Sequence, residues 1–209
     1  MERQDSVSSN KRGIEGLIDL DQARVLFEGF SRATGYATGM TDQESGAILV
    51  ASEYHPVCSE YHHQCDASEA ICRRANVLLA NKETDRGAVS IERCEHGLIV
   101  GKSRVLVEGR HLANVIAGQV LFSAPDLDEF RARAGQFGYD ETAYLDAVRK
   151  IPVVDENSFS AHVAFLADLA ATIAGMGLAG QQAADEAEIR SRERDALIRS
   201  EAKYRALFD

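Results

Sequence analysis

The stretch that decides the fold is GLIVGKSRVLVEGRHLANVIAGQVLF, residues 97–122, in the middle of the chain. It consists of two runs rich in Val, Ile and Leu, separated by the turn-forming Glu108-Gly109-Arg110. β-Branched residues favour strands, and a short glycine-containing break between two such runs is typical of a hairpin. The stretch therefore predicts two long antiparallel strands.

Shorter segments on the N-terminal side extend this sheet. The segments YATGM (36–40) and GAILVAS (46–52) flank the polar TDQES, which predicts two short antiparallel strands. AVSIERC (88–94) predicts one more strand directly before the long hairpin.

Helical spacing of apolar residues appears before and after the predicted sheet. A helix is predicted after Asp19, its N-cap, with Gly35 as its stop, and another after the candidate N-cap Ser68. Two short helices are predicted between Pro125 and Ile151, and a long one beyond Asp155. The sequence therefore predicts an α+β domain.

The two ends of the chain differ in composition from this domain. Residues 1–13 are polar and lack periodicity, so we predict a disordered lead-in, with the domain itself covering 14–180. Residues 181–200 lose most apolar side chains but keep Glu–Arg pairs at i,i+4 spacing, which predicts a helical linker and leaves open a dimeric coiled coil.

Composition excludes several classes of function. The chain has 209 residues and a formal net charge of −10, and it has no basic stripe, which argues against a nucleic-acid partner. No uninterrupted apolar run reaches the about 20 residues of a membrane helix, and the N-terminus lacks the apolar core of a secretion signal. We therefore expect a cytoplasmic protein without a membrane partner.

Four cysteines raise the main chemical question. Cys58, Cys65 and Cys72 lie at seven-residue steps, and Cys94 follows with His96 two positions later. A reducing cytosol disfavours disulfides, so four interpretations stay open: plain burial, a zinc ion or iron-sulfur cluster bound by the four thiols, an oxidisable thiol at Cys72 near a helix start, and a catalytic thiol. The cysteine pattern lacks the close pairs typical of zinc sites.

Several segments resemble the PocR-type sensory domain. The likeness is carried by YHPVCSEYH, CRRAN, RCEHGLIV, EGRHLANVIAGQVLF and FGYDETAYLDAVRKIPVV, in this order, between about Asp19 and Gly180. Its most specific part is Cys-x-x-Gly-Leu, followed by Gly118-Gln119. The resemblance implies a PAS/GAF-like antiparallel sheet flanked by helices, with a pocket for a small molecule and a long C-terminal signalling helix.

The end of the chain carries a second likeness. SEAKYRALFD, which includes residues 201–209, is similar to the start of a PAS domain. This implies the input module of a longer signalling protein, such as a histidine kinase of a two-component system, a cyclic-dinucleotide enzyme or a transcription regulator, with downstream PAS and effector domains. The resemblance implies no enzymatic activity for this module.

The resemblance also bears on the cysteines and on the ligand. Cys58, Cys72 and Cys94 match recurrent cysteines of the family, which implies that they meet in space, at a metal or at the pocket wall, while Cys65 does not match. Many members have an acidic residue where this chain has Val100 and a proline where it has Arg104. This chain therefore lacks the acidic residue that would anchor the diol ligand proposed for the family.

A small ligand needs a few polar groups in a mostly apolar enclosure. The candidate ligand-binding residues near the predicted sheet and its covering loop are Tyr54, His55, Tyr61, His62, Gln119 and Phe122. Arg104 is able to bind a carboxylate, although we expect it to point outward to water. The sequence thus predicts a small-molecule sensor that signals as a homodimer through its last helix, with a metal or redox sensor using the cysteine cluster as the alternative.

Overall fold

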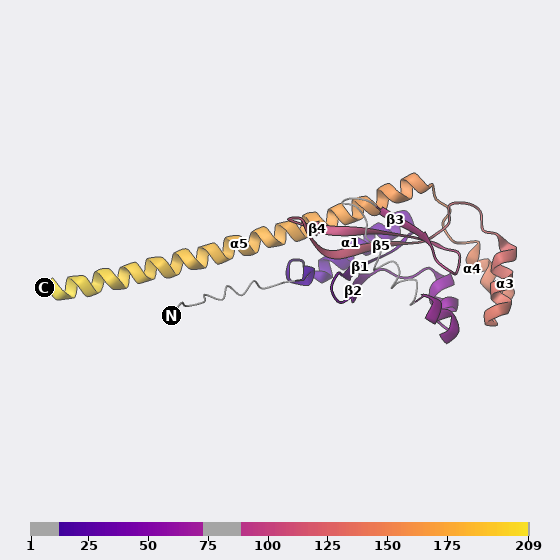
Figure 1. The fold of residues 1–209 in the computed structure, drawn as a ribbon, viewed down its shortest axis with the longest axis horizontal. Helices are drawn as coiled ribbons and strands as arrows, with labels where there is room; N and C mark the ends of the chain where they lie inside the picture. The colour runs from indigo at the N-terminus through magenta and orange to yellow at the C-terminus, as the bar shows by residue number, and fades with distance from the viewer. Residues whose placement is uncertain (1–12, 73–88, 209) are drawn as a thin grey trace, which may run out of the picture.

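The computed structural model describes residues 13–72 and 89–208 of the chain. Within them, five antiparallel strands form one sheet in the order β2-β1-β5-β4-β3, and helices flank it, so the predicted α+β class is confirmed (Figure 1). The strands are β1 (Ala37–Asp42), β2 (Ile48–Ala51), β3 (Val89–Arg93), β4 (Ile99–Val107) and β5 (Arg110–Val120). The helices are η1 (Ile14–Gly16), α1 (Leu20–Thr34), η2 (Val57–His62), α3 (Leu127–Phe137), α4 (Glu141–Val148) and α5 (Glu156–Phe208).

The predicted hairpin β4–β5 forms the centre of the sheet. Its turn places Glu108 and Gly109 at φ of 50° and 78°, the left-handed conformation that two-residue hairpin turns require. Pairing shifts register between Ile99 and Val100, so that Gln119 on β5 is left without an opposite residue. Gln119 has a φ of 62°, which makes it a bulge residue in a conformation that non-glycine residues rarely adopt.

Helices α1 and α5 cover the same face of the sheet. Fully buried residues from both helices join sheet residues such as Met40 and Val105 in one apolar cluster. Side chains alternate between faces along a strand, so on β4 the residues Gly101, Ser103 and Val105 face the helices, while Val100, Lys102 and Arg104 face away from them. Contact between Gly101 and α5 is so close that a Cβ there would lie 2.8 Å from Cε1 of Phe159.

A second apolar cluster lies at the end of the sheet where β4 begins. It joins η2 and the helices α3 and α4 through buried residues such as Val57, Phe130 and Tyr144. Figure 1 shows α3 and α4 together at this end, far from the free end of α5.

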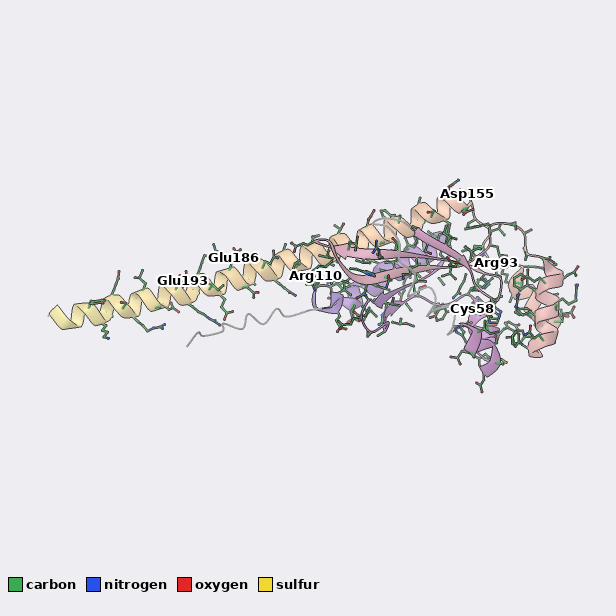
Figure 2. The ribbon with its side chains drawn as sticks, in the orientation of Figure 1. Cys58, Arg93, Arg110, Asp155, Glu186 and Glu193 are labelled. Carbon is green, nitrogen blue, oxygen red and sulfur yellow. The ribbon has the colours of Figure 1, made fainter. Side chains whose placement is uncertain are left out.

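Helix α5 runs without a break from the sheet edge to Phe208 (Figure 1). Its N-terminal part packs on the sheet, whereas the part that carries Glu186 and Glu193 extends beyond it (Figure 2). A tight contact lies at Gly177, because a Cβ there would lie 1.7 Å from the carbonyl oxygen of Leu17. The side chain of Gln181 also donates to the carbonyl oxygen of Gly16.

By length and composition alone, α5 is also apolar enough to cross a membrane. A window within Glu156–Tyr204 has a mean hydropathy of 1.7, and 28% of that window is buried inside the domain. A core helix of a soluble protein passes the same test, so this is weak evidence for a membrane span. The expectation of no membrane partner stays a prediction.

The predicted helix ends agree with the structure in most places. Asp19 accepts hydrogen bonds from the backbone N–H groups of Asp21 and Gln22, and Gly35 ends α1 in the left-handed conformation, as predicted. One expectation was wrong: Ser68 is no N-cap, because the chain is already helical at residue 66. The rest of that predicted helix and nearly all of the predicted lead-in lie outside the described residues.

Candidate ligand-binding cavity

A cavity of about 700 Å³ lies on the face of the sheet opposite to α1 and α5. Its walls come from β1, β4 and β5, from the turn after β1, and from the segment between β2 and residue 72. This volume falls within the range of about 300 to 1,000 Å³ that is typical of small-molecule sites. The cavity thus brings together segments that are far apart in the chain.

Basic side chains line the part of the cavity near the β4–β5 turn. Lys102 and Arg104 stand two residues apart on β4, and Lys102 is 1% exposed. Burial and the nearby positive charge of Arg104 lower the pKa of Lys102. Arg104 was expected to point to water, but it lines the cavity, and its Nε atom is buried without a hydrogen-bond partner.

Polar groups of β5 lie beside these two cations. Asn114 pairs with Arg104 in the sheet register, and its Oδ1 atom is 3.0 Å from Nε2 of His111. Burial lowers the pKa of His111, and the charges of Arg104 and Lys102 lower it further, against the raising effect of Asn114. This end of the cavity therefore brings two basic side chains, an amide and an imidazole together.

Thiols and apolar side chains line the opposite part of the cavity. Cys58 in η2, Cys72 at the end of the described helical turn and Cys94 after β3 all reach the wall, together with Leu98 and Val100. The three cysteines that match the family's recurrent positions thus share one cavity, whereas Cys65 is not among the residues that line it.

The electrostatics keep these thiols protonated. Burial is the main cause that raises the pKa of Cys58 and Cys94, and it raises the pKa of Cys72 to about 11. Cys72 lies in the second turn of its helix and not at the start, so the predicted stabilisation of its thiolate by a helix N-terminus is absent. The walls offer neutral sulfur, a polarizable and weakly polar surface.

The metal interpretation gains no support from the geometry. Among residues 13–72 and 89–208, no group of three or more His, Cys, Asp or Glu side chains is placed to hold a metal ion. All four cysteines are free thiols.

Of the six predicted ligand-binding residues, the cavity brings together two. Tyr54 and Gln119 line it, and Tyr54 is 41% exposed. The aromatic ring of Phe122 lies on the other side of the sheet, in edge contact with Phe159. The ring of Tyr61 packs against Tyr144 in the second apolar cluster.

The remaining two, His55 and His62, have structural contacts. The backbone N–H of His55 donates to Oε1 of Gln119, which ties the segment after β2 to the bulge in β5. His62 is fully buried, and its Nε2 atom is 2.9 Å from the hydroxyl of Tyr144. Nδ1 of His62 lies 3.8 Å from Sγ of Cys58. His62 therefore contacts a residue of the cavity wall without lining the cavity itself.

His62 also stacks on His96, with ring centroids 4.0 Å apart. Nε2 of His96 is 3.2 Å from both the hydroxyl and the carbonyl oxygen of Ser68. Burial lowers the pKa of His62 to about 2 and also lowers the pKa of His96. Both rings are therefore neutral, and they link η2, the helical turn of Ser68 and the turn before β4.

Sequence reasoning missed the residues that give the cavity its charge. Lys102, Asn114 and His111 were not among the predicted ligand-binding residues. The alternation along β4 was the available signal: Val100, Lys102 and Arg104 share one face, and a Lys and an Arg two residues apart in an otherwise apolar strand suggest a second, polar surface.

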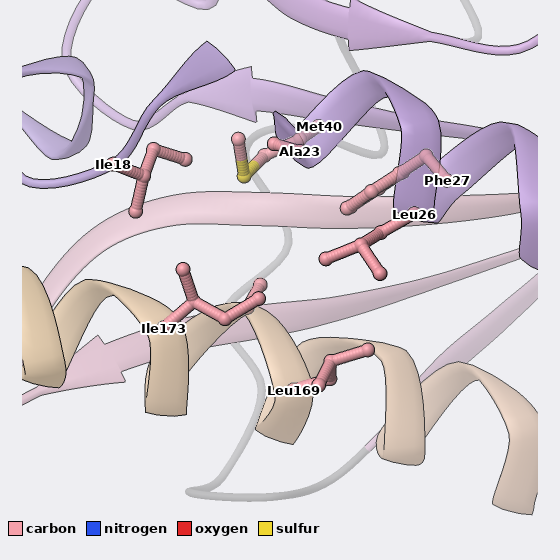
Figure 3. Close-up of a pocket in the computed structure, with 8 residues that line it drawn as sticks. Ile18, Ala23, Leu26, Phe27, Met40, Leu169 and Ile173 are labelled. Carbon is pink, nitrogen blue, oxygen red and sulfur yellow. The ribbon is translucent and has the colours of Figure 1, made fainter. Parts of the chain in front are cut away.

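The structure contains another, much smaller cavity, shown in Figure 3 between α1 and α5. Its volume is about 10 Å³, and its walls are apolar side chains such as Leu26, Phe27 and Ile173. A single water molecule needs about 10 to 15 Å³ and polar partners. This gap is therefore a packing defect of the core and not a site.

The fold and the large cavity define a class of protein: an α+β domain whose sheet carries a site of small-molecule size. Residues 16–178 match the model of the family described as the sensory domain found in PocR. This match covers most of the chain, which therefore belongs to the PocR sensory domain family. The chain is thus a ligand-sensing input domain.

The other comparisons add little. No curated protein matches the chain at a significant level. Among solved structures, the ATP-dependent caprolactamase from Pseudomonas jessenii is similar at a TM-score of 0.41 and 8% identity, over 80% of this chain and 33% of that one. The chain spans about a third of the length of that protein, and a likeness at this level supports no statement about function.

Proposed function

We propose that this chain is the input module of a bacterial signalling protein and that occupancy of the large cavity is its signal. One observation carries the proposal: β4 separates the cavity from α5. Val100 and Lys102 line the cavity, while Gly101 between them lies against Phe159 of α5. A ligand that shifts β4 by a fraction of an ångström therefore changes the surface on which α5 rests.

The size of the expected effect follows from linkage. A ligand shifts an equilibrium between two states only by its difference in affinity for them, which is typically about 1 to 3 kcal/mol in allosteric proteins. Such a bias is sufficient to reposition α5 for downstream PAS and effector domains of a histidine kinase, a cyclic-dinucleotide enzyme or a transcription regulator. We propose no catalytic activity for the module itself and a cytoplasmic location, in which the free thiols stay reduced.

We further propose that the module works as a homodimer through α5. Phe165 and Met176 lie eleven residues apart, about three helical turns, and therefore on one side of α5. They are 58% and 71% exposed, and Leu197 and Tyr204 continue the exposed apolar positions beyond the sheet. A second copy of the same helix is the occupant that fits a strip of this length, because the sheet of its own chain does not reach the distal part.

The experiment that tests the proposed function is native mass spectrometry of the purified chain, combined with hydrogen exchange. We expect a retained small molecule, and we expect its removal to speed amide exchange in β4 and at the start of α5. The variant Ile116→Trp places a large ring in the cavity and should abolish retention. The control Val153→Trp changes an exposed residue outside the cavity and should retain the molecule. Exchange that changes only in α3 and α4 would contradict the proposal.

The second candidate function is a metal or redox sensor. The observation that favours it is that Cys58, Cys72 and Cys94 share one wall of the cavity. Elemental analysis of protein purified without air tests it. Bound zinc or iron that disappears in the variant with all three cysteines changed to Ser would support this function, and a folded, metal-free wild type would rule out the metal form.

A further inference from the structure

The two ends of the large cavity differ in chemistry. Arg104, Lys102, Asn114 and His111 lie toward the β4–β5 turn, and Cys58, Cys94 and Leu98 lie at the other end. At about 3.3 Å per strand residue, Val100 and Arg104 are about 13 Å apart along β4. A molecule that satisfies both ends has one polar, negatively charged end and an apolar body of several carbons.

Arg104 is the residue that needs a partner. A guanidinium stays charged at all physiological pH values, and burying it without an acceptor is costly. Among the described residues Arg104 forms no ion pair, and its buried Nε atom has no acceptor. The planar guanidinium binds carboxylates with two parallel hydrogen bonds, which suits an anion at this place.

Two acidic residues among those that the structure describes, Asp42 and Glu44, line the cavity near this end. The carboxylate of Asp42 accepts hydrogen bonds from the backbone N–H groups of Glu44 and Ser45 and from the hydroxyl of Ser45, at 3.1, 2.7 and 2.7 Å. It is therefore used by its own turn. The side chain of Glu44 is exposed.

We propose that the ligand of this sensor is a monocarboxylate with an apolar body, such as a medium-chain or aryl-alkanoic acid. Its carboxylate binds Arg104, which lies two residues from Lys102 on the same face of β4, and its body lies along Ile116 and Val100 toward the thiols and Leu98. This inference rests on the proposed function and names the class of ligand for the same site. The thiol end accepts the apolar body because neutral sulfur is weakly polar.

The test is a titration of the ligand-free chain with hexanoate and phenylpropionate, followed by calorimetry and by thermal unfolding. The matched neutral probes are hexanediol and phenylpropanol, and inorganic phosphate is the probe for a simple anion site. We expect saturable binding of the carboxylates, with neutral probes weaker by about tenfold or more, because hydrogen bonds to charged groups contribute more than neutral ones. Phosphate, which lacks an apolar body, should not bind.

Two variants locate the carboxylate. Arg104→Gln keeps a hydrogen-bonding side chain and removes the charge, so carboxylate affinity should fall about tenfold or more while the neutral probes are unaffected. Arg110→Gln removes an exposed arginine at the start of β5 and should bind as the wild type does. Circular dichroism checks that both variants are folded. If Arg104→Gln is unstable, Arg104→Lys replaces it. This variant keeps the positive charge and should bind the carboxylates more weakly than the wild type but more tightly than the neutral probes.

The outcomes separate the two proposals. Equal or tighter binding of the neutral probes, or carboxylate binding that Arg104→Gln and Arg104→Lys leave unchanged, would overturn the carboxylate assignment and leave the sensor function standing. Phosphate binding as tight as that of the carboxylates would also overturn it. No binding of any probe, together with no molecule retained in native mass spectrometry, would overturn both.

Discussion

His62 and His96 stack face to face with ring centroids 4.0 Å apart and an interplanar angle of 18°, although 34 positions separate them in the sequence. One ring belongs to η2 and the other to the turn between β3 and β4. Because His62 also lies 3.8 Å from the sulfur of Cys58, this pair supports the cavity wall from the side of the apolar cluster.

The histidine stack predicts a specific pH dependence of stability. The pKa of His62 in the folded chain is about 2, below the value of about 6.5 for an unfolded histidine, and the pKa of His96 is also lowered. The unfolded chain therefore binds more protons than the folded chain below about pH 6.5. The free energy of unfolding should be retained above that pH and fall below it, with a slope that approaches about 1.4 kcal/mol per pH unit for His62 and an additional loss from His96.

Urea unfolding between pH 7.5 and pH 5 measures this dependence. The variant His62→Gln should show a shallower loss on acidification than the wild type, because one of the two titrating rings is gone. Gln64→Ala changes an exposed, non-titrating residue outside the stack and should keep the wild-type slope. Identical slopes for His62→Gln and the wild type would contradict the assignment.

The contact between Gly177 and Leu17 predicts a large effect of one methyl group. A Cβ at Gly177 would overlap the carbonyl oxygen of Leu17, so Gly177→Ala should separate η1 from α5 and lower the free energy of unfolding by about 1 to 3 kcal/mol. Gly175→Ala is the matched control, because nothing lies within 4 Å of its Cβ position. Alanine there should stabilise the helix by up to about 1 kcal/mol, and thermal unfolding of both variants checks the opposite signs.

The bulge at Gln119 predicts that glycine is tolerated better than alanine. Both substitutions remove the acceptor for the N–H of His55, but only alanine keeps a side chain at a φ of 62°. The variant Gln119→Ala should therefore be less stable than Gln119→Gly by roughly 1 kcal/mol in urea unfolding. Equal stabilities would show that the backbone at this position is relaxed.

The exposed apolar side chains of α5, such as Phe165 and Met176, predict that a charged residue in their place weakens the dimer. Phe165→Glu and Met176→Glu should each shift the chain toward monomer in sedimentation analysis, because a buried carboxylate without a partner opposes association. Val153→Glu, which alters an exposed apolar residue outside α5, should leave the sedimentation of the chain unchanged. A wild type that is monomeric at high concentration would contradict the proposed homodimer.

Much of the fold was predictable because it depends on local patterns. The hairpin of β4 and β5 and the caps at Asp19 and Gly35 follow from turn and capping chemistry that acts within a few residues. The short helix η2 was not predicted, since VCSEYH has no helical apolar spacing and is held by burial of Val57 and His62 against α4.

The site was less predictable, because its charge depends on which face of a strand each residue occupies. The bulge at Gln119 brings both Gly118 and Gln119 of β5 to the cavity, and the sequence does not mark the bulge. Similarly, the two adjacent histidines have separate environments: His63 reaches the cavity and His62 is buried behind it. Only the tertiary structure shows which distant segments of the chain meet in one wall of the cavity.

The tight contact at Gly177 has a mechanical consequence. Phe159 lies 18 residues before this contact and Phe208 lies 31 residues after it, which are about 27 Å and about 47 Å along a rigid helix. If the contact with Leu17 acts as a fulcrum, α5 is a lever whose outer arm is longer than its inner arm. A displacement of Phe159 by the sheet then becomes a larger displacement, in the opposite direction, at the far end.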